Sequence, residues 1–191
     1  MNLVAPKLGL GSQYVSLGKE LPVPVWPYSQ LSSWHRTFLL KDPKTMRVLR
    51  EVQNQASEPD KITALIQIIS ENLGYALYRA VESTKVSLTE NEAAGFAFGH
   101  GSVHIEDTLE RWRFESWIQP DIQNIATCVK SLFSQHNVNY SDIGSVFLTG
   151  GSSFVPYVRR FFAKIFGSEK LKGGEELTTV AKGLALRALE N

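Results

Sequence analysis

The chain has 191 residues, of which 43% are hydrophobic and 20% are charged, and its formal net charge is +1. These values are typical of a globular protein with a buried core, and they give no electrostatic basis for binding nucleic acid or an anionic membrane. The single cysteine, Cys128, excludes a disulfide framework within the chain and favours a reducing compartment. No apolar run reaches the length of a membrane span and no secretory signal pattern occurs, so we expect a cytoplasmic protein.

Residues 1–41 predict a packed segment without long regular elements. Glycine and proline recur too often for a long helix or a central strand. The segment is nevertheless too aromatic for a disordered tail, so we expect a loop-like layer over an apolar surface. Its aromatic residues include Trp26, Tyr28, Trp34 and Phe38.

Two helices are predicted next. Asp42 followed by Pro43 is typical of a helix start, and an apolar face continues to about Ser57. A second, longer helix is predicted from Pro59, because apolar residues recur every three or four positions as far as Thr84. Spacing alone indicates a solvated face opposite that core face, carrying Tyr78, Glu82, Lys85 and Thr89.

A β-hairpin is predicted after this helix, since apolar residues alternate from Phe96 to Ile105 on either side of a Gly-His-Gly sequence. Asp107 and Glu110 have the spacing of a capping box and predict the start of the next helix. That helix continues toward His136, and Pro120 is expected to kink or restart it.

The segment from Ser145 to Gly167 predicts a strand, a glycine turn and a helix. Residues 146–149 are bulky and apolar, which is typical of a strand buried on both faces. Gly150 and Gly151 allow a sharp turn, and Pro156 suits the first turn of a helix that ends at Gly167. This arrangement directs backbone N–H groups at an anion or a sugar phosphate.

The predicted strand lacks obvious neighbours, and a lone buried strand is not stable. Either residues 1–41 supply its partners or the chain is part of a larger fold. A short 170–172 segment follows, and a last helix is predicted with Leu177, Ala181, Leu184 and Ala188 on one face.

Other functions fit the residues less well. A P-loop requires a lysine that the Gly150-Gly151-Ser152-Ser153 sequence lacks, and a nucleophile elbow requires glycine where Phe154 stands. The hydrolase triad also requires a histidine after the serine, whereas all four histidines precede it. A docking module without chemistry remains an alternative, because Phe161, Phe162 and Phe166 suit either an interface or a plain core.

Four segments carry a resemblance to a known family. Residues 80–89 read Ala-Val-Glu-Ser-Thr-Lys-Val-Ser-Leu-Thr, and residues 146–156 read Val-Phe-Leu-Thr-Gly-Gly-Ser-Ser-Phe-Val-Pro. Residues 113–115 read Arg-Phe-Glu, and residues 180–185 read Val-Ala-Lys-Gly-Leu-Ala. In order and spacing, over about residues 60–189, they resemble the ATPase domain of DnaK-type heat-shock chaperones in the actin-like ATPase superfamily. Residues 26–28 and 31–34 look more like its YegD-type branch.

The resemblance implies a binding site for ATP or ADP. Glu82 would accept hydrogen bonds from the ribose hydroxyls, Lys85 would donate to the ribose, and Thr89 would donate to the adenine edge. Gly150 and Gly151 would present backbone N–H groups to the phosphates with Ser152 beside them. Phe154 replaces an arginine that stacks on adenine in many members, and an aromatic ring could stack there without charge.

The resemblance also implies an α/β fold in which helix predominates: a partial actin-like ATPase lobe. Residues 1–108 would form a helical subdomain with the β-hairpin, and residues 109–191 an incomplete strand–helix layer. The resemblance implies that the full-length protein is an Mg²⁺-dependent ATPase. We find none of the family's phosphate loops in this chain, so we expect the chain alone to be inactive and not to ligate Mg²⁺.

We expect client proteins or co-chaperones as partners of the full-length protein. Self-association of the chain is also expected, through an exposed sheet edge or apolar face. Another actin-like ATPase or a sugar-kinase-like lobe remains an alternative.

Overall fold

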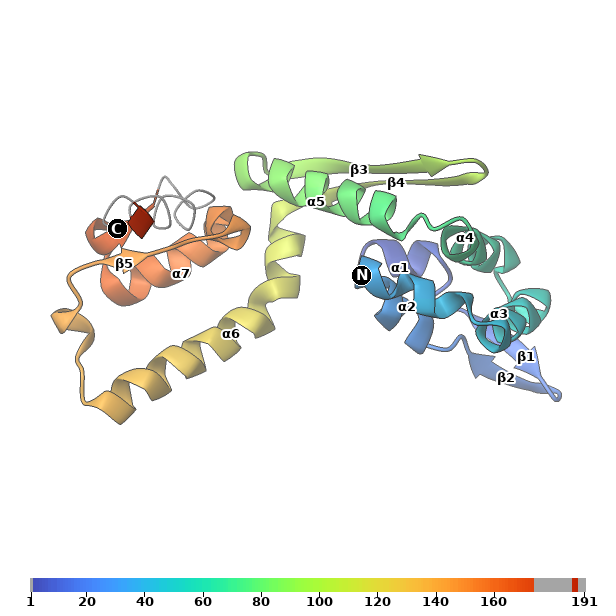
Figure 1. The fold of residues 1–191 in the computed structure, drawn as a ribbon, viewed down its shortest axis with the longest axis horizontal. Coiled ribbons are helices and arrows are strands. Elements are labelled where there is room, and N and C mark those ends of the chain that lie inside the picture. Colours follow the sequence, from blue (N-terminus) through green and yellow to red (C-terminus); the bar gives the residue numbers. More distant parts are fainter. Residues whose placement is uncertain (1, 174–186, 189–191) are drawn as a thin grey trace. The chain divides into compact units, whose positions relative to one another are not determined.

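The structure is a computed structural model that describes residues 2–173 and 187–188 (Figure 1). The chain divides into two compact units, residues 1–111 and 112–191, which we describe separately. Most of the predicted last helix, including Leu177, Ala181 and Leu184, lies outside the described residues, as does the 180–185 segment.

The N-terminal segment is packed, as predicted, but it is not loop-like. Leu8 and Tyr28 are buried, and the Tyr28 hydroxyl donates to the Leu8 carbonyl at 2.9 Å. The missed hairpin turns at Leu17 and Gly18, whose φ angles of 51° and 72° match a two-residue turn that usually carries Asn-Gly. The elements are α1 (Val4–Lys7), β1 (Gln13–Ser16), β2 (Lys19–Pro22), α2 (Trp26–Leu31) and a 3₁₀ helix, η1 (Trp34–Lys41).

The next helix, α3 (Pro43–Gln55), begins as predicted. Asp42 Oδ2 accepts hydrogen bonds from the backbone N–H groups of Lys44 and Thr45, at 3.0 and 3.1 Å. These bonds satisfy two donors that would otherwise have no partner within the helix.

The single long helix predicted after Pro59 is wrong, because the chain forms two helices, α4 (Pro59–Ser70) and α5 (Gly74–Glu90). Asn72 separates them with φ 60°, a left-handed conformation that asparagine tolerates better than most residues. The apolar periodicity continues across the break and hides it. As a result the buried face of α5 is shifted from the one that the continuous periodicity predicts: Leu77 is buried, and Ala76 is exposed.

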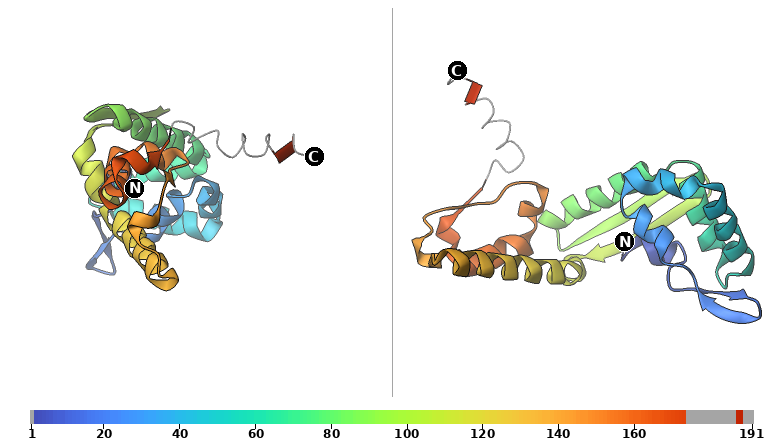
Figure 2. Two further views of the ribbon diagram at one scale, coloured as in Figure 1. Left: turned by 90° about the vertical axis from the view of Figure 1, so that its left-hand side faces the viewer. Right: turned by 60° about the horizontal axis from the view of Figure 1, so that its bottom comes forward.

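The predicted hairpin is confirmed as strands β3 (Ala93–His100) and β4 (Val103–Glu110), paired antiparallel. Alternate residues face the core, and Phe96 and Val103 are 1% and 2% exposed. The two strands lie along α5 (Figure 2). The predicted capping box is wrong, because Asp107 lies within β4 and forms an ion pair with Lys7 at 3.2 Å.

The second unit begins with the long helix α6 (Arg111–His136). The helix continues through Pro120 instead of restarting there, and Figure 1 shows that it bends along its length. A proline removes one intrahelical hydrogen bond, which permits a bend without ending the helix.

The strand predicted at residues 146–149 is shorter and more exposed than expected. Only Val146 and Phe147 form β5, which pairs in parallel with β6 (Leu171–Lys172), and Phe147 is 73% exposed. The strand is therefore not buried on both faces in this chain. The remaining elements are η2 (Tyr140–Asp142), η3 (Gly151–Phe154), α7 (Pro156–Phe166) and η4 (Ser168–Lys170).

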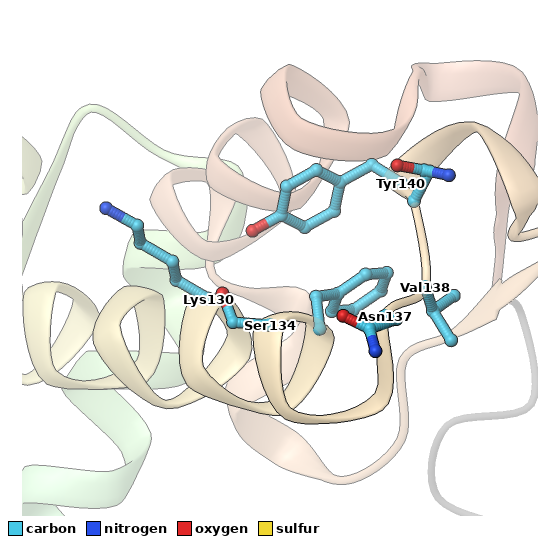
Figure 3. Close-up of a pocket in the computed structure, with 7 residues that line it drawn as sticks. Lys130, Ser134, Asn137, Val138 and Tyr140 are labelled. Carbon is cyan, nitrogen blue, oxygen red and sulfur yellow. The ribbon is translucent and has the colours of Figure 1, made fainter.

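Aromatic side chains hold α6, η2 and α7 together. The rings of Phe133 and Tyr140 stack with centroids 4.4 Å apart, and Phe166 lies against both. An open hollow lies where α6 ends, beside this cluster (Figure 3). The residues that line the hollow include Lys130, Ser134, Asn137 and Val138, and none of the predicted site residues is among them.

We predict that Gly74→Ala destabilises the first unit. A Cβ at Gly74 would lie 2.6 Å from Oγ1 and 3.0 Å from Cβ of Thr37, a buried and β-branched side chain that cannot easily move away. Overpacking of this kind costs about 1–3 kcal/mol. Urea unfolding measures the loss, and Gly95→Ala is the control, because a Cβ there meets no atom of the part of the chain that the structure describes within 4 Å. Equal stability of the two variants would contradict the prediction.

Candidate functional site

Two charged residues predicted to bind ribose lie together on α5. Glu82 Oε1 and Lys85 Nζ form an ion pair one helical turn apart, and their side chains are 34% and 40% exposed. The opposite face of the helix is buried at Leu77, Thr84 and Leu88. Because an exposed ion pair contributes little to stability, both groups can exchange this contact for one with a ligand at small cost.

Thr89 lies one turn farther along α5. Its hydroxyl donates to the Val86 carbonyl at 2.7 Å, so its proton is used within the helix and its oxygen can still accept a hydrogen bond. Donation to adenine, which the resemblance implies, requires this internal bond to break.

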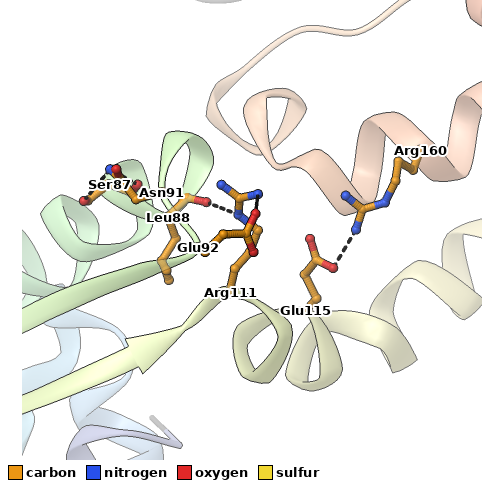
Figure 4. A network of polar contacts seen from close by, with 7 residues as sticks. All are labelled: Ser87, Leu88, Asn91, Glu92, Arg111, Glu115 and Arg160. Carbon is orange, nitrogen blue, oxygen red and sulfur yellow. Dashed lines mark hydrogen bonds and ion pairs between the residues drawn. The ribbon is translucent and has the colours of Figure 1, made fainter.

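The C-terminal end of α5 is fixed by Arg111, which the sequence analysis did not single out (Figure 4). The Arg111 guanidinium donates to the Leu88 carbonyl at 2.9 Å and to Glu92 at 2.7 Å. Its side chain is 14% exposed, so the ion pair is largely shielded on the arginine side. The signal in the sequence that could have identified Arg111 is that a basic residue directly follows the second hairpin strand. Arg111 thereby holds the turn that carries Thr89.

The second group of predicted residues lies in the turn at Gly150. Gly150 has φ 82° and ψ 166°, a backbone conformation that is essentially limited to glycine. The hydroxyl of Ser153 donates to the Gly150 carbonyl at 2.6 Å, and the Ser153 N–H donates to the same oxygen at 3.0 Å. The buried serine that shapes the turn is therefore Ser153, whereas Ser152 is exposed.

The outer side of this turn is open. A Cβ placed at Gly150 or Gly151 would meet no atom of residues 2–173 or 187–188 within 4 Å, so these residues leave room for a ligand to approach this backbone closely. Phe154 ends the 3₁₀ turn with its side chain 38% exposed, which leaves ring surface available for stacking. The helix α7 follows, and no side chain among the described residues caps its N-terminus.

Arg160 and Glu115 join α7 to α6 within the second unit. Arg160 donates to Glu115 Oε2 at 2.6 Å (Figure 4). The Glu115 carboxylate is only 15% exposed, so this contact holds the helix behind the glycine turn firmly against α6.

The geometry also bears on two other kinds of site. The Ser153 hydroxyl is bonded to a backbone carbonyl, and no histidine bonds to it among the described hydrogen bonds, which argues against a nucleophile elbow. Asp142 and Gly144 have the Asp-x-Gly spacing of the phosphate loops in the family that the sequence resembles, but the Asp142 carboxylate accepts hydrogen bonds from Asn139 and Ser141. Those hydrogen bonds, the backbone one from Asn139 first, lower the pKa of Asp142.

Within residues 2–173 and 187–188, no three His, Cys, Asp or Glu side chains gather as a metal site would require. Among the helices described, none combines the length and apolar character that crossing a membrane requires.

The fold and the two groups define an α/β protein in which helix predominates and each sheet of the described residues has two strands. Residues 58–189 match the family model described as Hsp70 protein. The chain therefore belongs to the Hsp70 family. The match includes both groups of candidate residues, and it leaves out residues 1–57.

Individual relatives agree with the family match. A mitochondrial heat shock 70 kDa protein of Pisum sativum is 29% identical over 134 residues, 66% of this chain and 20% of that protein. The chaperone protein HscA of Buchnera aphidicola is 30% identical over 112 residues, 59% of this chain and 21% of that protein. The chaperone protein DnaK of Thermosipho africanus is 32% identical over 92 residues, 48% and 15% respectively. The chain thus spans about a fifth of the length of these relatives, or less.

We predict that the two glycines of the turn respond differently to alanine. Gly150→Ala forces a side chain into a glycine-only conformation, which costs about 1–3 kcal/mol. Gly151 does not have a positive φ, and the described residues leave space for a methyl group there. Gly151→Ala should therefore change the free energy of unfolding by about 0.5 kcal/mol or less. Urea unfolding of both variants tests this. A loss at Gly151 as large as that at Gly150 would show that the turn is built differently.

Proposed function

We propose that this chain supplies the adenosine-binding half of the ATP/ADP site of an Hsp70-type chaperone ATPase. The observation that carries the proposal is the turn at Gly150 and Gly151. Its backbone is exposed on one side, its shape requires glycine, and it lies within the part of the chain that matches Hsp70. Such a turn is suited to a ligand that approaches the main chain directly.

The ribose would be held by Glu82 and Lys85. A carboxylate accepts hydrogen bonds from two neighbouring hydroxyl groups, and an ammonium group donates to a hydroxyl or ring oxygen. Both side chains are part-exposed on the same helix turn, as this requires. Thr89 would contact the adenine edge, and its hydroxyl oxygen would accept a hydrogen bond there as long as the hydroxyl donates to the Val86 carbonyl.

The phosphates would be met by the backbone N–H groups of Gly150 and Gly151, with the exposed Ser152 hydroxyl as a further donor. Phe154 would stack on adenine. A neutral ring adds dispersion and quadrupole contacts but lacks the charge of an arginine, so we expect this stacking to depend little on salt.

ATP hydrolysis is proposed for the full-length protein and not for this chain. Phosphoryl transfer depends on positioning the phosphates and neutralising their charge, largely through Mg²⁺. The resemblance assigns that work to phosphate loops upstream of the matched region. This chain's own residues would bind and orient the adenosine part.

Client proteins and co-chaperones are proposed partners of the full-length protein by the same family membership. The exposed Phe147 on a two-stranded sheet supports the expected self-association of this chain. The similarity supports the Hsp70 family and no particular branch or compartment, so the YegD-like branch and the cytoplasmic location stay predictions.

We predict weak binding of ADP by the 191-residue chain, with a dissociation constant of about 1 mM, because half of the site is present. In ¹H–¹⁵N NMR spectra, the shifted resonances should belong to Glu82–Thr89 and Gly150–Phe154. Lys85→Ala removes a charged donor and should weaken binding about tenfold or more.

Lys61→Ala is the matched control. Lys61 forms the same kind of exposed pair with Glu58, one turn away on α4, and should leave ADP binding unchanged. Submicromolar binding of ADP or measurable ATP hydrolysis by this chain would contradict the half-site proposal. If Lys85→Ala and Gly151→Ala both leave ADP binding unchanged, the docking-module alternative is favoured.

A further inference from the structure

Arg111 supplies a positive charge that the C-terminal end of α5 lacks. No basic residue lies in the last turn of this helix, although a cation is favoured there, because the last four carbonyl groups have no partner within the helix and carry partial negative charge. Arg111 follows Leu88 by 23 positions, and its Nε donates to the Leu88 carbonyl at 2.9 Å (Figure 4). The end of α5 is therefore held by a residue that is distant in the sequence.

The two hydrogen bonds of the Arg111 side chain differ in their surroundings. The bond to Glu92 reaches a carboxylate that is 88% exposed, so water competes with it. The bond to the Leu88 carbonyl is better shielded, because the arginine side chain is 14% exposed and Leu88 is 1% exposed. The backbone N–H of Arg111 also donates to the Glu92 carbonyl at 2.7 Å, which fixes the position from which the guanidinium reaches α5.

The guanidinium orders the last turn of α5 and not the whole helix. Farther back, the Thr84 hydroxyl lies 3.2 Å from the Gly95 carbonyl, and this contact attaches the helix to β3 without the arginine. Helix ends fray unless they are held, so the last turn depends most on the guanidinium. Among the residues proposed to bind nucleotide, Thr89 lies in that turn, whereas Glu82 and Lys85 precede it.

The hydrogen bond of the Thr89 hydroxyl restricts what it can recognise. The hydroxyl donates to the Val86 carbonyl at 2.7 Å, so its oxygen can only accept a hydrogen bond from a ligand. On the adenine ring of a nucleotide, the amino group at C6 is the hydrogen-bond donor. An ordered Thr89 therefore favours a purine that carries this amino group.

We propose that Arg111 is a positioning residue of the proposed nucleotide site. By holding the Leu88 carbonyl, it orders the turn of α5 in which the Thr89 hydroxyl accepts a hydrogen bond from the 6-amino group of adenine. Arg111 acts through this turn and does not itself touch the nucleotide. The inference rests on the proposed function and adds to it the residue on which the preference for an amino-bearing purine depends.

ADP and purine riboside 5′-diphosphate, which lacks the 6-amino group, are the matched probes. Each is titrated into the full 191-residue chain and followed by ¹H–¹⁵N NMR. The unaltered chain should bind ADP about fivefold more tightly than the analogue. Arg111→Ala should weaken ADP binding about fivefold and change binding of the analogue less than about twofold, so that the preference disappears. Without ligand, the ¹H–¹⁵N nuclear Overhauser effect at Thr89 and Glu90 should fall in this variant, and that at Glu82 should not.

Two further variants accompany Arg111→Ala. Arg113→Ala removes the same kind of side chain two positions farther along α6, where its guanidinium lies 5.3 Å from the centroid of the Trp117 ring, and should leave both affinities unchanged. Arg111→Lys keeps the charge and the aliphatic stem but lacks the planar fork that reaches Leu88 and Glu92 together. Its preference for ADP should lie between those of the unaltered chain and Arg111→Ala.

The outcomes separate the positioning role from the nucleotide site itself. Equal weakening of both probes by Arg111→Ala would show a merely structural role and overturn the proposal, and so would an unchanged affinity for ADP. If Arg111→Ala does not fold, Arg111→Lys decides, and a preference equal to that of the unaltered chain overturns the proposal. Failure of the unaltered chain to bind ADP would overturn the proposed function, and the positioning role with it.

Discussion

The packing of α5 on strand β3 is the constraint on which the first unit depends. The Thr84 hydroxyl, buried in that interface, lies within hydrogen-bonding distance of the carbonyls of Ala80 and Gly95, at 3.1 and 3.2 Å. Its single proton can bond to either carbonyl, and the Gly95 contact joins the helix to the strand. Arg111 fixes the far end of the same helix through the Leu88 carbonyl. With one face of α5 buried in this way, a turn of about 100° per residue leaves Glu82 and Lys85 at the surface.

The two groups of candidate residues would contact the proposed nucleotide in different ways. On α5 the side chains would make the contacts, and the helix spaces them. At Gly150 the backbone would make them, and the surrounding side chains shape the turn, as the Ser153 hydroxyl does. This division suits a nucleotide, because sugar hydroxyls require specific donors and acceptors whereas phosphate oxygens accept from any N–H that points toward them.

The sequence predicted the elements whose signals are local. The Asp42 cap, the alternation in the β3–β4 hairpin and the Pro156–Gly167 helix limits were all correct. It failed where one backbone angle decided the outcome. Asn72 breaks a continuous apolar periodicity, and Leu17 occupies a left-handed turn position that leucine seldom takes. Neither residue type is enough to predict a left-handed conformation at its position.

The placement of the candidate residues was predictable in part for the same reason. The spacing of Glu82 and Lys85 places them on one helix turn whatever surrounds them, and their ion pair follows from it. The burial of Ser153 and the exposure of Ser152 depend on a 3₁₀ turn, which the predicted order of strand, turn and helix did not include. The packing of Thr37 against Gly74 depends on contacts between segments far apart in the chain, which no local pattern encodes.

The N-terminal segment is part of the core of the first unit, although residues 1–57 lie outside the family match. A Cβ at Gly9 would lie 2.5 Å from Cδ1 of Ile62, so the backbone of this segment packs directly on α4. The Tyr28 hydroxyl, bonded to the Leu8 carbonyl, is buried deeply enough to raise its pKa. Ile62 itself is fully buried. The matched helices α4 and α5 therefore obtain part of their buried surface from a segment outside the family match.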